Sequence, residues 1–198
     1  MRVLTVRQPW AWAIIHGGKD VENRVRNIAG DYRGPVLIHV AKADDDAAFA
    51  PEHPMHGLIF APCPNRASVD HNRHHCHWCT HTAPSKYGHK GCIIGVVDLV
   101  DVHRPLWNHA CTDDDTDGPC SLWAETAGWP YHLVLANPRA LDEPLPYRGA
   151  LGLRKTNFGI VGDRLVEYHE PCKSPCAGVY GCPPQCHMDP VARLVATS

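Results

Sequence analysis

Two neighbouring stretches near the start of the chain decide the fold: Thr5-Val6-Arg7-Gln8-Pro9-Trp10-Ala11-Trp12 and Gly17-Gly18-Lys19-Asp20-Val21-Glu22-Asn23-Arg24. The apolar, β-branched run just before Arg7 predicts a short strand over residues 3–6. Residues 9–16 are expected to form a helix, because Pro9 suits a first helical turn and Gly17-Gly18 suits a helix end. A charged loop then leaves the helix at Lys19. The sequence therefore predicts a strand, a helix and a charged loop in immediate succession.

Short strands and turns continue outward from this start. We expect strands at 35–40, 92–103 and 131–135, a turn at 137–141, and a closing hairpin or strand at 159–168. Several short strands with one early helix favour an α+β fold, a small mixed β-barrel with the helix beside its cleft, over a parallel α/β sheet.

Two segments break this pattern. Residues 43–91 are rich in His and Pro and poor in large apolar side chains, and we interpret them as an insertion without a core of its own. Residues 171–198 are rich in Cys, Pro and Gly, and we expect a tail rather than an ordinary packed element. The predicted organisation is therefore one domain over 1–170, interrupted by the insertion and followed by the tail.

The charge of the chain is unevenly distributed. The formal net charge is −2, but residues 1–42 hold seven Lys and Arg against three Asp and Glu, whereas residues 92–171 hold six against twelve. Local basicity of this kind can bind phosphate even when total charge is near zero. We find no signal peptide and no stretch of about 18 apolar residues, so we expect a cytoplasmic protein with no membrane association.

The first forty residues resemble the ASCH domain family. The family hallmark, G-x-K-x-x-x-x-R after a helix, is met by Gly17, Lys19 and Arg24, and the preceding Gln8-Pro9-Trp10 strengthens the match. The resemblance covers roughly 3–42 and 92–168. It implies a barrel fold related to the PUA domain, which binds RNA, and it implies RNA or other nucleic-acid binding in a cleft beside the helix. A few family members are hydrolases acting on modified nucleosides or on RNA.

The residue types of this region suit nucleic-acid binding. A lysine and an arginine on one loop can hold phosphate, a tryptophan can stack on a base, and a carboxylate can accept from an exocyclic amino group. Two alternatives stay open: Glu22 and Arg24 could simply form an ion pair, and only one of Trp10 and Trp12 can face the cleft. The candidate nucleic-acid-binding residues are Arg7, Gln8, Trp10, Gly17, Lys19, Glu22 and Arg24.

An enzyme is the second hypothesis. Hydrolytic relatives pair the loop lysine with a threonine three residues on and with a distant glutamate, whereas Lys19 is followed at that offset by Glu22. A lysine beside a glutamate can still run acid–base chemistry if burial lowers the lysine pKa. The candidate catalytic residues are Lys19, Glu22 and Glu125.

The chain holds 10 Cys and 15 His, which in a reducing compartment favours metal ligation over disulfides. We predict structural zinc in the insertion and a second zinc site, or alternatively two disulfides, in the tail. For Cys111 and Cys120 the sequence leaves open free thiols, a clip or additional ligands. A third hypothesis is a protein-interaction module whose contact surface is the zinc insertion. The predicted ligands in the insertion are Cys63, Cys76 and Cys79, with the fourth left open between Cys92 and one of His71, His75, His81 and His89. The predicted ligands in the tail are Cys172, Cys176, Cys182 and Cys186.

Overall fold

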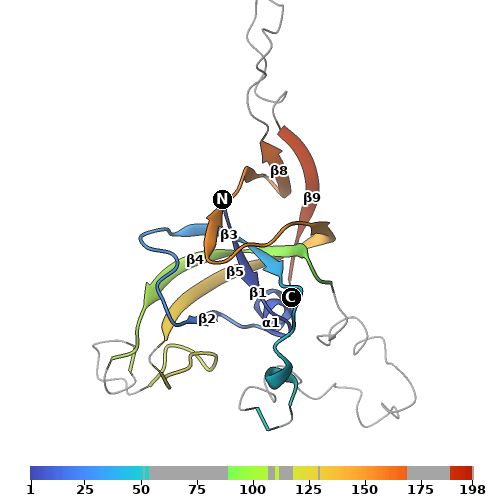
Figure 1. Cartoon of the computed structure of the whole chain (residues 1–198). Helices are drawn as coiled ribbons and strands as arrows, with labels where there is room; N and C mark the ends of the chain where they lie inside the picture. Colours follow the sequence, from blue (N-terminus) through green and yellow to red (C-terminus); the bar gives the residue numbers. More distant parts are fainter. Residues whose placement is uncertain are drawn as a thin grey trace, which may run out of the picture.

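The computed structural model of the chain describes residues 1–50, 52–53, 89–106, 110–111, 118–128, 130–168 and 188–197. Within them, one short helix and a 3₁₀ turn (Asp46–Phe49) accompany strands that form a single curled sheet, a half-barrel (Figure 1). The predicted small, mostly β fold with an N-terminal helix is thus confirmed. No helix in the described ranges is long and apolar enough to cross a membrane.

The strands of the sheet do not follow the order of the chain. Strand β1 (Arg2–Val6) pairs with β3 (Gly34–Val40) in parallel, and all the other described pairs are antiparallel. A further strand, β2 (Val21–Arg24), pairs with β5 (Tyr131–Pro146) off the main path. The main order is β6 (Leu153–Lys155), β1 (Arg2–Val6), β3 (Gly34–Val40), β4 (Cys92–His103), β5 (Tyr131–Pro146), β9 (Met188–Ala196), β8 (Arg164–Tyr168) and β7 (Phe158–Val161).

The helix α1 (Trp10–His16) packs its apolar face on the sheet. Ala11, Ala13, Ile14 and Ile15 are buried, and the helix contacts β3, β4 and β5. Close approach is possible because β4 has a glycine beneath the helix: a Cβ on Gly95 would lie 2.6 Å from Cδ1 of Ile15. Helix packing therefore fixes where the chain leaves α1, and with it the position of the loop that carries Lys19.

Both faces of the central strands are covered. Adjacent residues of a strand point to opposite faces, yet Leu37 and Ile38 of β3 are both fully buried, as are Val3 and Leu4 of β1. Ile38 and Leu4 belong to the core beneath α1, whereas Leu37 and Val3 belong to a second core that includes β7 and β8. The closing hairpin predicted over 159–168 is found as β7 and β8 and supplies this second cover.

The turn predicted at 137–141 is wrong. Strand β5 runs through it, and the pairing with β4 jumps from Ala136 opposite Asp98 to Arg139 opposite Val96. Asn137, with a φ of 50°, and Pro138 fall in the bulge that this jump creates, where a proline needs no ladder partner. Arg139 and the amide of Asn137 both donate to the Asp98 carboxylate, at 2.8 and 2.9 Å. The turn-like residues therefore mark a kink within a long strand.

The tail prediction also needs correction. Residues 188–196 form β9, which pairs with both β5 and β8 and joins the hairpin to the rest of the sheet (Figure 1). Leu194 of β9 lies in the second core. The apolar residues of Val191-Ala192-Arg193-Leu194-Val195 are the physical reason. Most of the predicted insertion, and residues 171–187 of the predicted tail, lie outside the described residues.

Candidate functional site

A cleft with a volume of about 540 Å³ opens beside α1, between β2 and the segments 123–125 and 150–152. The loop Gly17–Asp20 turns the chain from α1 into β2, and Gly17 allows it: a Cβ there would sit 2.9 Å from the Cα of Ala13. This turn brings Lys19 and the residues of β2 into the cleft. The cleft thus lies where the sequence hallmark places its lysine and arginine.

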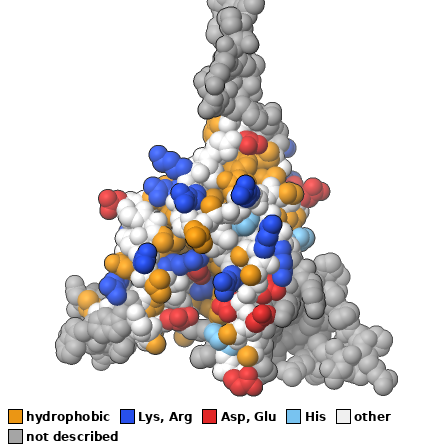
Figure 2. Space-filling view, in the orientation of Figure 1, with side chains coloured by type: hydrophobic (Ala, Val, Ile, Leu, Met, Phe, Trp, Pro, Cys, Tyr) orange, Lys and Arg blue, Asp and Glu red, His pale blue; other side chains and the backbone are white. Residues whose placement is uncertain are grey.

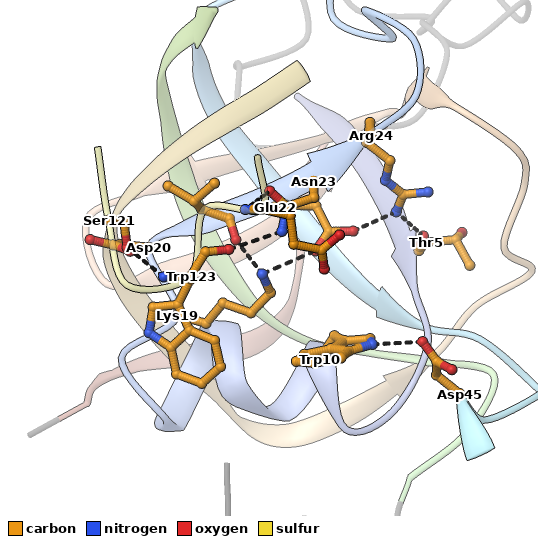
Figure 3. Close-up of polar contacts among 12 residues, drawn as sticks. Thr5, Trp10, Lys19, Asp20, Glu22, Asn23, Arg24, Asp45, Ser121 and Trp123 are labelled. Atoms are coloured by element: carbon orange, nitrogen blue, oxygen red, sulfur yellow. Dashed lines mark hydrogen bonds and ion pairs between the residues drawn. The ribbon is translucent and has the colours of Figure 1, made fainter. Parts of the chain in front are cut away.

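Lys19 lies at the bottom of the cleft and is only 4 % exposed. Its amine donates to the backbone oxygen of Val21 and lies 3.7 Å from the carboxylate of Glu22. The same amine is 5.5 Å from the ring centre of Trp10 and 5.6 Å from that of Trp123, so it sits between two aromatic rings (Figure 3). Burial lowers the pKa of Lys19, and the nearby charge of Glu22 opposes that shift.

Glu22 is shared by both cations of the hallmark. Its carboxylate accepts from Arg24 at 3.0 Å on one side and faces Lys19 on the other. Arg24 also donates to the backbone oxygen of Thr5 at 2.9 Å, which ties β2 to the end of β1 (Figure 3). The ion pair that the sequence left open is therefore present, and it does not remove Arg24 from the cleft: that side chain remains 31 % exposed.

The two tryptophans of α1 separate as the helical spacing requires. Trp10 lines the cleft, and its indole Nε1 donates to Asp45 at 2.8 Å, which fixes the ring orientation (Figure 3). Trp12 does not line the cleft and packs against a small cluster around Val21 and Trp123. We call Trp10, Lys19, Glu22 and Trp123 the cleft floor.

One wall of the cleft is the segment 121–125, which is held in place by polar bonds. Asn23 donates to the backbone oxygen of Trp123 at 2.9 Å and accepts from the backbone N–H of Glu125 at 3.1 Å. Ser121 donates to the carboxylate of Asp20 (Figure 3). These bonds bring the predicted catalytic trio of Lys19, Glu22 and Glu125 to one cleft.

The cleft continues into a second cavity of about 690 Å³ that shares Thr5, Ala41, Ala150 and Leu151 with it. Lys42 and Arg148 line this second cavity, and both are exposed, as is Arg7 in the first. We call Arg7, Lys42 and Arg148 the cleft rim. Basic side chains on the molecular face in Figure 2 are interspersed with acidic and apolar ones rather than gathered in one patch.

The lining of the first cleft is not a basic surface. Arg7, Lys19 and Arg24 are balanced by three carboxylates, those of Glu22, Asp45 and Glu125. The expected excess of positive charge is found only when the rim of the second cavity is included. A ligand would therefore meet neutral, aromatic surroundings at the floor and positive charge at the rim.

Two other predicted binding residues have structural positions. Gln8 is buried, and its side-chain oxygen accepts from the backbone N–H of Trp12 at 3.0 Å, which satisfies a free donor at the start of α1. Gly17 forms the helix end rather than the cleft lining. Both residues therefore position the helix beside the cleft and do not line the cleft themselves.

Of the predicted cysteine ligands, only Cys92 belongs to the described part of the chain. It opens β4 and is buried in the core beneath α1, and burial raises the pKa of its thiol. The other predicted ligands, Cys63, Cys76, Cys79, Cys172, Cys176, Cys182 and Cys186, lie outside the described residues.

A group of potential metal ligands that the sequence did not predict as a set lies where β4 ends and β5 begins. Suitable atoms of four side chains lie within 4.8 Å of one another and could hold a metal ion. Burial, followed by the neighbouring Cys111, raises the pKa of Cys120 to about 12. His103 ends β4, and His132 faces it from β5. The cluster consists of His103, Cys111, Cys120 and His132.

Several of these residues were not predicted from the sequence. Trp123 and Asn23 have no motif of their own, although Asn23 lies within the Glu22-Asn23-Arg24 run. Asp45 falls at the start of the predicted insertion, where nothing marks it as a partner of Trp10. His103 and His132 meet only because β4 and β5 pair in one register, and a strand-pairing prediction would have been the signal for them.

A curled, mostly β half-barrel with one helix beside a charged cleft defines a PUA-like domain. Comparison with known families agrees with this class: the ASCH domain matches residues 4–144. That match covers most of the chain, and the chain belongs to the ASCH domain family.

Proposed function

We propose that the cleft binds RNA, with an unstacked or modified base at the floor and the phosphate backbone along the rim. The observation that carries this proposal is the amine of Lys19 held between the rings of Trp10 and Trp123, in a cleft that stays open beside Arg24. A volume of about 540 Å³ lies within the roughly 300–1,000 Å³ typical of small-ligand pockets.

The floor supports recognition of a base. Aromatic faces bind unstacked bases without regard to sequence, and the bond from Trp10 to Asp45 sets the ring orientation before any ligand arrives. Preorganised groups lose less entropy on binding. The carboxylate of Glu22 can accept from a base amino group, and Lys19 can donate to a carbonyl. A nucleoside with polar edges fits this combination better than an apolar ligand does.

The rim supports contact with phosphates. Arg7, Lys42 and Arg148 are exposed around the two connected cavities, whereas Lys19, the cation of the floor, already faces the carboxylate of Glu22. Phosphate contacts add affinity that falls steeply with salt. Membership of the ASCH family makes RNA binding plausible.

The test is fluorescence anisotropy with a labelled single-stranded RNA of about twelve nucleotides, titrated at several salt concentrations. We expect Lys19→Met and Arg24→Gln each to weaken binding at least tenfold. Lys155→Met removes an exposed charge on β6 away from the cleft and is the matched control. Circular dichroism checks that each variant is folded.

Equal affinity of the wild-type chain, Lys19→Met and Arg24→Gln for this RNA would contradict the proposal. Tight binding with no salt dependence would contradict the rim assignment. Failure to bind this RNA at any salt concentration would favour the third hypothesis, a protein-interaction module.

Hydrolysis of a modified nucleoside or of RNA is the alternative function. It is favoured by the lowered pKa of Lys19 together with Glu22 at 3.7 Å and Glu125 in the same cleft. A buried lysine that loses its proton more easily can serve as a base. Turnover of an acylated nucleoside or of RNA, followed by chromatography and abolished by Lys19→Ala, would establish it. Glu125→Gln should then reduce the rate without weakening binding.

Zinc in the insertion and in residues 172–186, and a cytoplasmic location, remain part of this proposal. Metal analysis of the purified full chain tests for the zinc. Fractionation of cells that produce the chain tests the cytoplasmic location.

A further inference from the structure

We infer that one zinc ion binds where β4 and β5 meet the loop between them, on His103, Cys111, Cys120 and His132. We further infer that this ion fixes the 121–125 wall of the cleft. The second statement rests on the proposed function, whereas the first does not.

The spacing of the ligand atoms fits a tetrahedral site. With Zn–S of about 2.3 Å and Zn–N of about 2.0 Å, sulfur and nitrogen ligands lie roughly 3.5 Å apart. The sulfur atoms of Cys111 and Cys120 lie 3.4 and 3.5 Å from Nδ1 of His132. The ring of His103 is 5.3 Å from that of His132 and nearly perpendicular to it, at 81°. The four side chains thus surround one point.

Outer hydrogen bonds leave the correct ring nitrogens free for a metal. Nε2 of His132 donates to the backbone oxygen of Glu125 at 2.7 Å, and Nδ1 of His103 faces the carboxylate of Asp101 at 2.6 Å. Metal-bound histidines almost always donate their second N–H to such a group. The remaining nitrogen of His103, Nε2, is buried and has no hydrogen-bond partner within the described residues. A metal ion at the centre would satisfy it.

The ligand chemistry selects zinc and a structural role. Two thiolates and two imidazoles suit zinc in tetrahedral geometry, and two thiolates balance its charge. His132 is fully buried, so an uncompensated dication there would be costly. Four protein ligands leave no open position for a water nucleophile.

The loop between the two strands explains why a metal is needed. Residues 104–130 connect β4 to β5, and their described part contains no helix or strand. Loops of this length seldom hold a defined shape without support. Two ligands come from paired strand positions and two from the loop, so a single ion would cross-link the loop to the sheet.

The cross-link reaches the cleft through short steps. Cys120 immediately precedes Ser121, which donates to Asp20, and the ring of His132 holds the backbone oxygen of Glu125. Trp123, one side of the cleft floor, lies between these anchors. Loss of zinc should therefore loosen the wall and one face of the base-binding floor, while leaving Trp10 and the rim in place.

The first experiment measures how fast each cysteine of the wild-type full chain is alkylated, with mass spectrometry to identify the labelled residues. We expect N-ethylmaleimide to label Cys111 and Cys120 at least tenfold more slowly with zinc than after EDTA and reductant. Cys120 is exposed, so the reagent can reach its sulfur once the metal has been removed. Equal labelling rates under both conditions would overturn the zinc site and leave only thiol–imidazole hydrogen bonds.

The second experiment compares variants. Cys111→Ser with Cys120→Ser should lose one zinc equivalent relative to the wild type, and it should lose the corresponding thiolate-to-cobalt absorption after cobalt substitution. Lys155→Met, an exposed substitution on β6 away from the cluster, should lose neither. An unchanged zinc content in the folded double variant would overturn the site.

The link to the cleft is read by RNA anisotropy on the same proteins. We expect the double variant to bind RNA three- to tenfold more weakly, with the wild-type salt dependence retained. Loss of zinc without any change in affinity would overturn the link alone. Failure of the zinc-loaded wild type to bind RNA would overturn the proposed function and leave the metal result standing.

Discussion

The cleft floor and the cleft rim handle positive charge in opposite ways. At the floor, Lys19 is buried and faces a carboxylate that also pairs with Arg24. At the rim, Arg7, Lys42 and Arg148 are exposed to solvent. A compensated, buried charge acts mainly over short distances, whereas an exposed one attracts a polyanion from afar. The difference indicates that the floor selects what binds and the rim sets how fast and how tightly a charged strand arrives.

The largest effect should come from breaking the floor itself. Glu22→Gln keeps the side-chain shape but leaves the buried amine of Lys19 without its carboxylate, and Arg24 loses the same partner. Removing one member of a buried ion pair costs about 3 kcal/mol or more. We therefore expect the free energy of unfolding in urea to fall by about 3 kcal/mol. A fall below about 1 kcal/mol would mean that water reaches the floor and that the two regions differ less than their burial indicates.

Removing a floor ring should affect binding more than stability. Trp10→Ala takes away one stacking face, and such faces contribute about 1–3 kcal/mol per base, so RNA affinity should fall about tenfold. Trp12→Ala removes a half-buried tryptophan of the same helix that lies outside the cleft. The RNA affinity of Trp12→Ala should stay within about twofold of the wild type in the same anisotropy assay. Equal losses of affinity in both variants would argue against stacking at Trp10.

A rim substitution should change salt dependence more than affinity. Arg148→Ala should weaken RNA binding only a few-fold and should reduce the slope of log K against log salt by about 0.7, the value for one single-strand phosphate contact. Lys155→Ala, outside both cavities, should leave the slope unchanged. A rim variant with a wild-type slope would remove Arg148 from the phosphate path.

The smallest effect concerns His39, which lies on β3 against the second cavity. Burial lowers the pKa of this histidine, so the unfolded chain binds its proton more readily than the folded one. Its contribution to stability is complete above pH 6.5, the ordinary histidine value, and is lost as pH falls below it. We expect His39→Gln to flatten the fall in unfolding free energy between pH 7 and 5, as measured by urea titration.

Local sequence predicted the elements whose residues carry their own signals. The helix is bounded by Pro9 and Gly17, and the strand over 92–103 is marked by its many β-branched residues; both appear where expected. The G-x-K hallmark placed Lys19 and Arg24 at the cleft because the intervening loop is short and the helix is fixed by packing. In these cases the information lies within about ten residues.

Features that depend on distant pairing could not be predicted. Asn137-Pro138 has the composition of a turn, and only the register of β4 against β5 makes it a bulge. Gln8 was predicted to line the cleft, but its side chain accepts a hydrogen bond from the backbone N–H of Trp12 at the start of α1. The four residues of the cluster around His132 come from two strands and a loop, so no short spacing motif in the sequence predicts that they meet. Charge balance in the cleft likewise depends on Asp45 and Glu125, which reach it from separate segments.

The junction between β3 and β4 has a consequence for how long the connection between them can be. Val40 ends β3, and its carbonyl accepts from Gly91, the residue just before β4, at 2.9 Å; the two points therefore behave like the ends of an antiparallel hairpin. Because this hydrogen bond holds the two strands together, a longer connection between them costs conformational entropy that grows only with the logarithm of its length. Added residues can thus be accommodated at this position, beside the second cavity, without a change in the half-barrel.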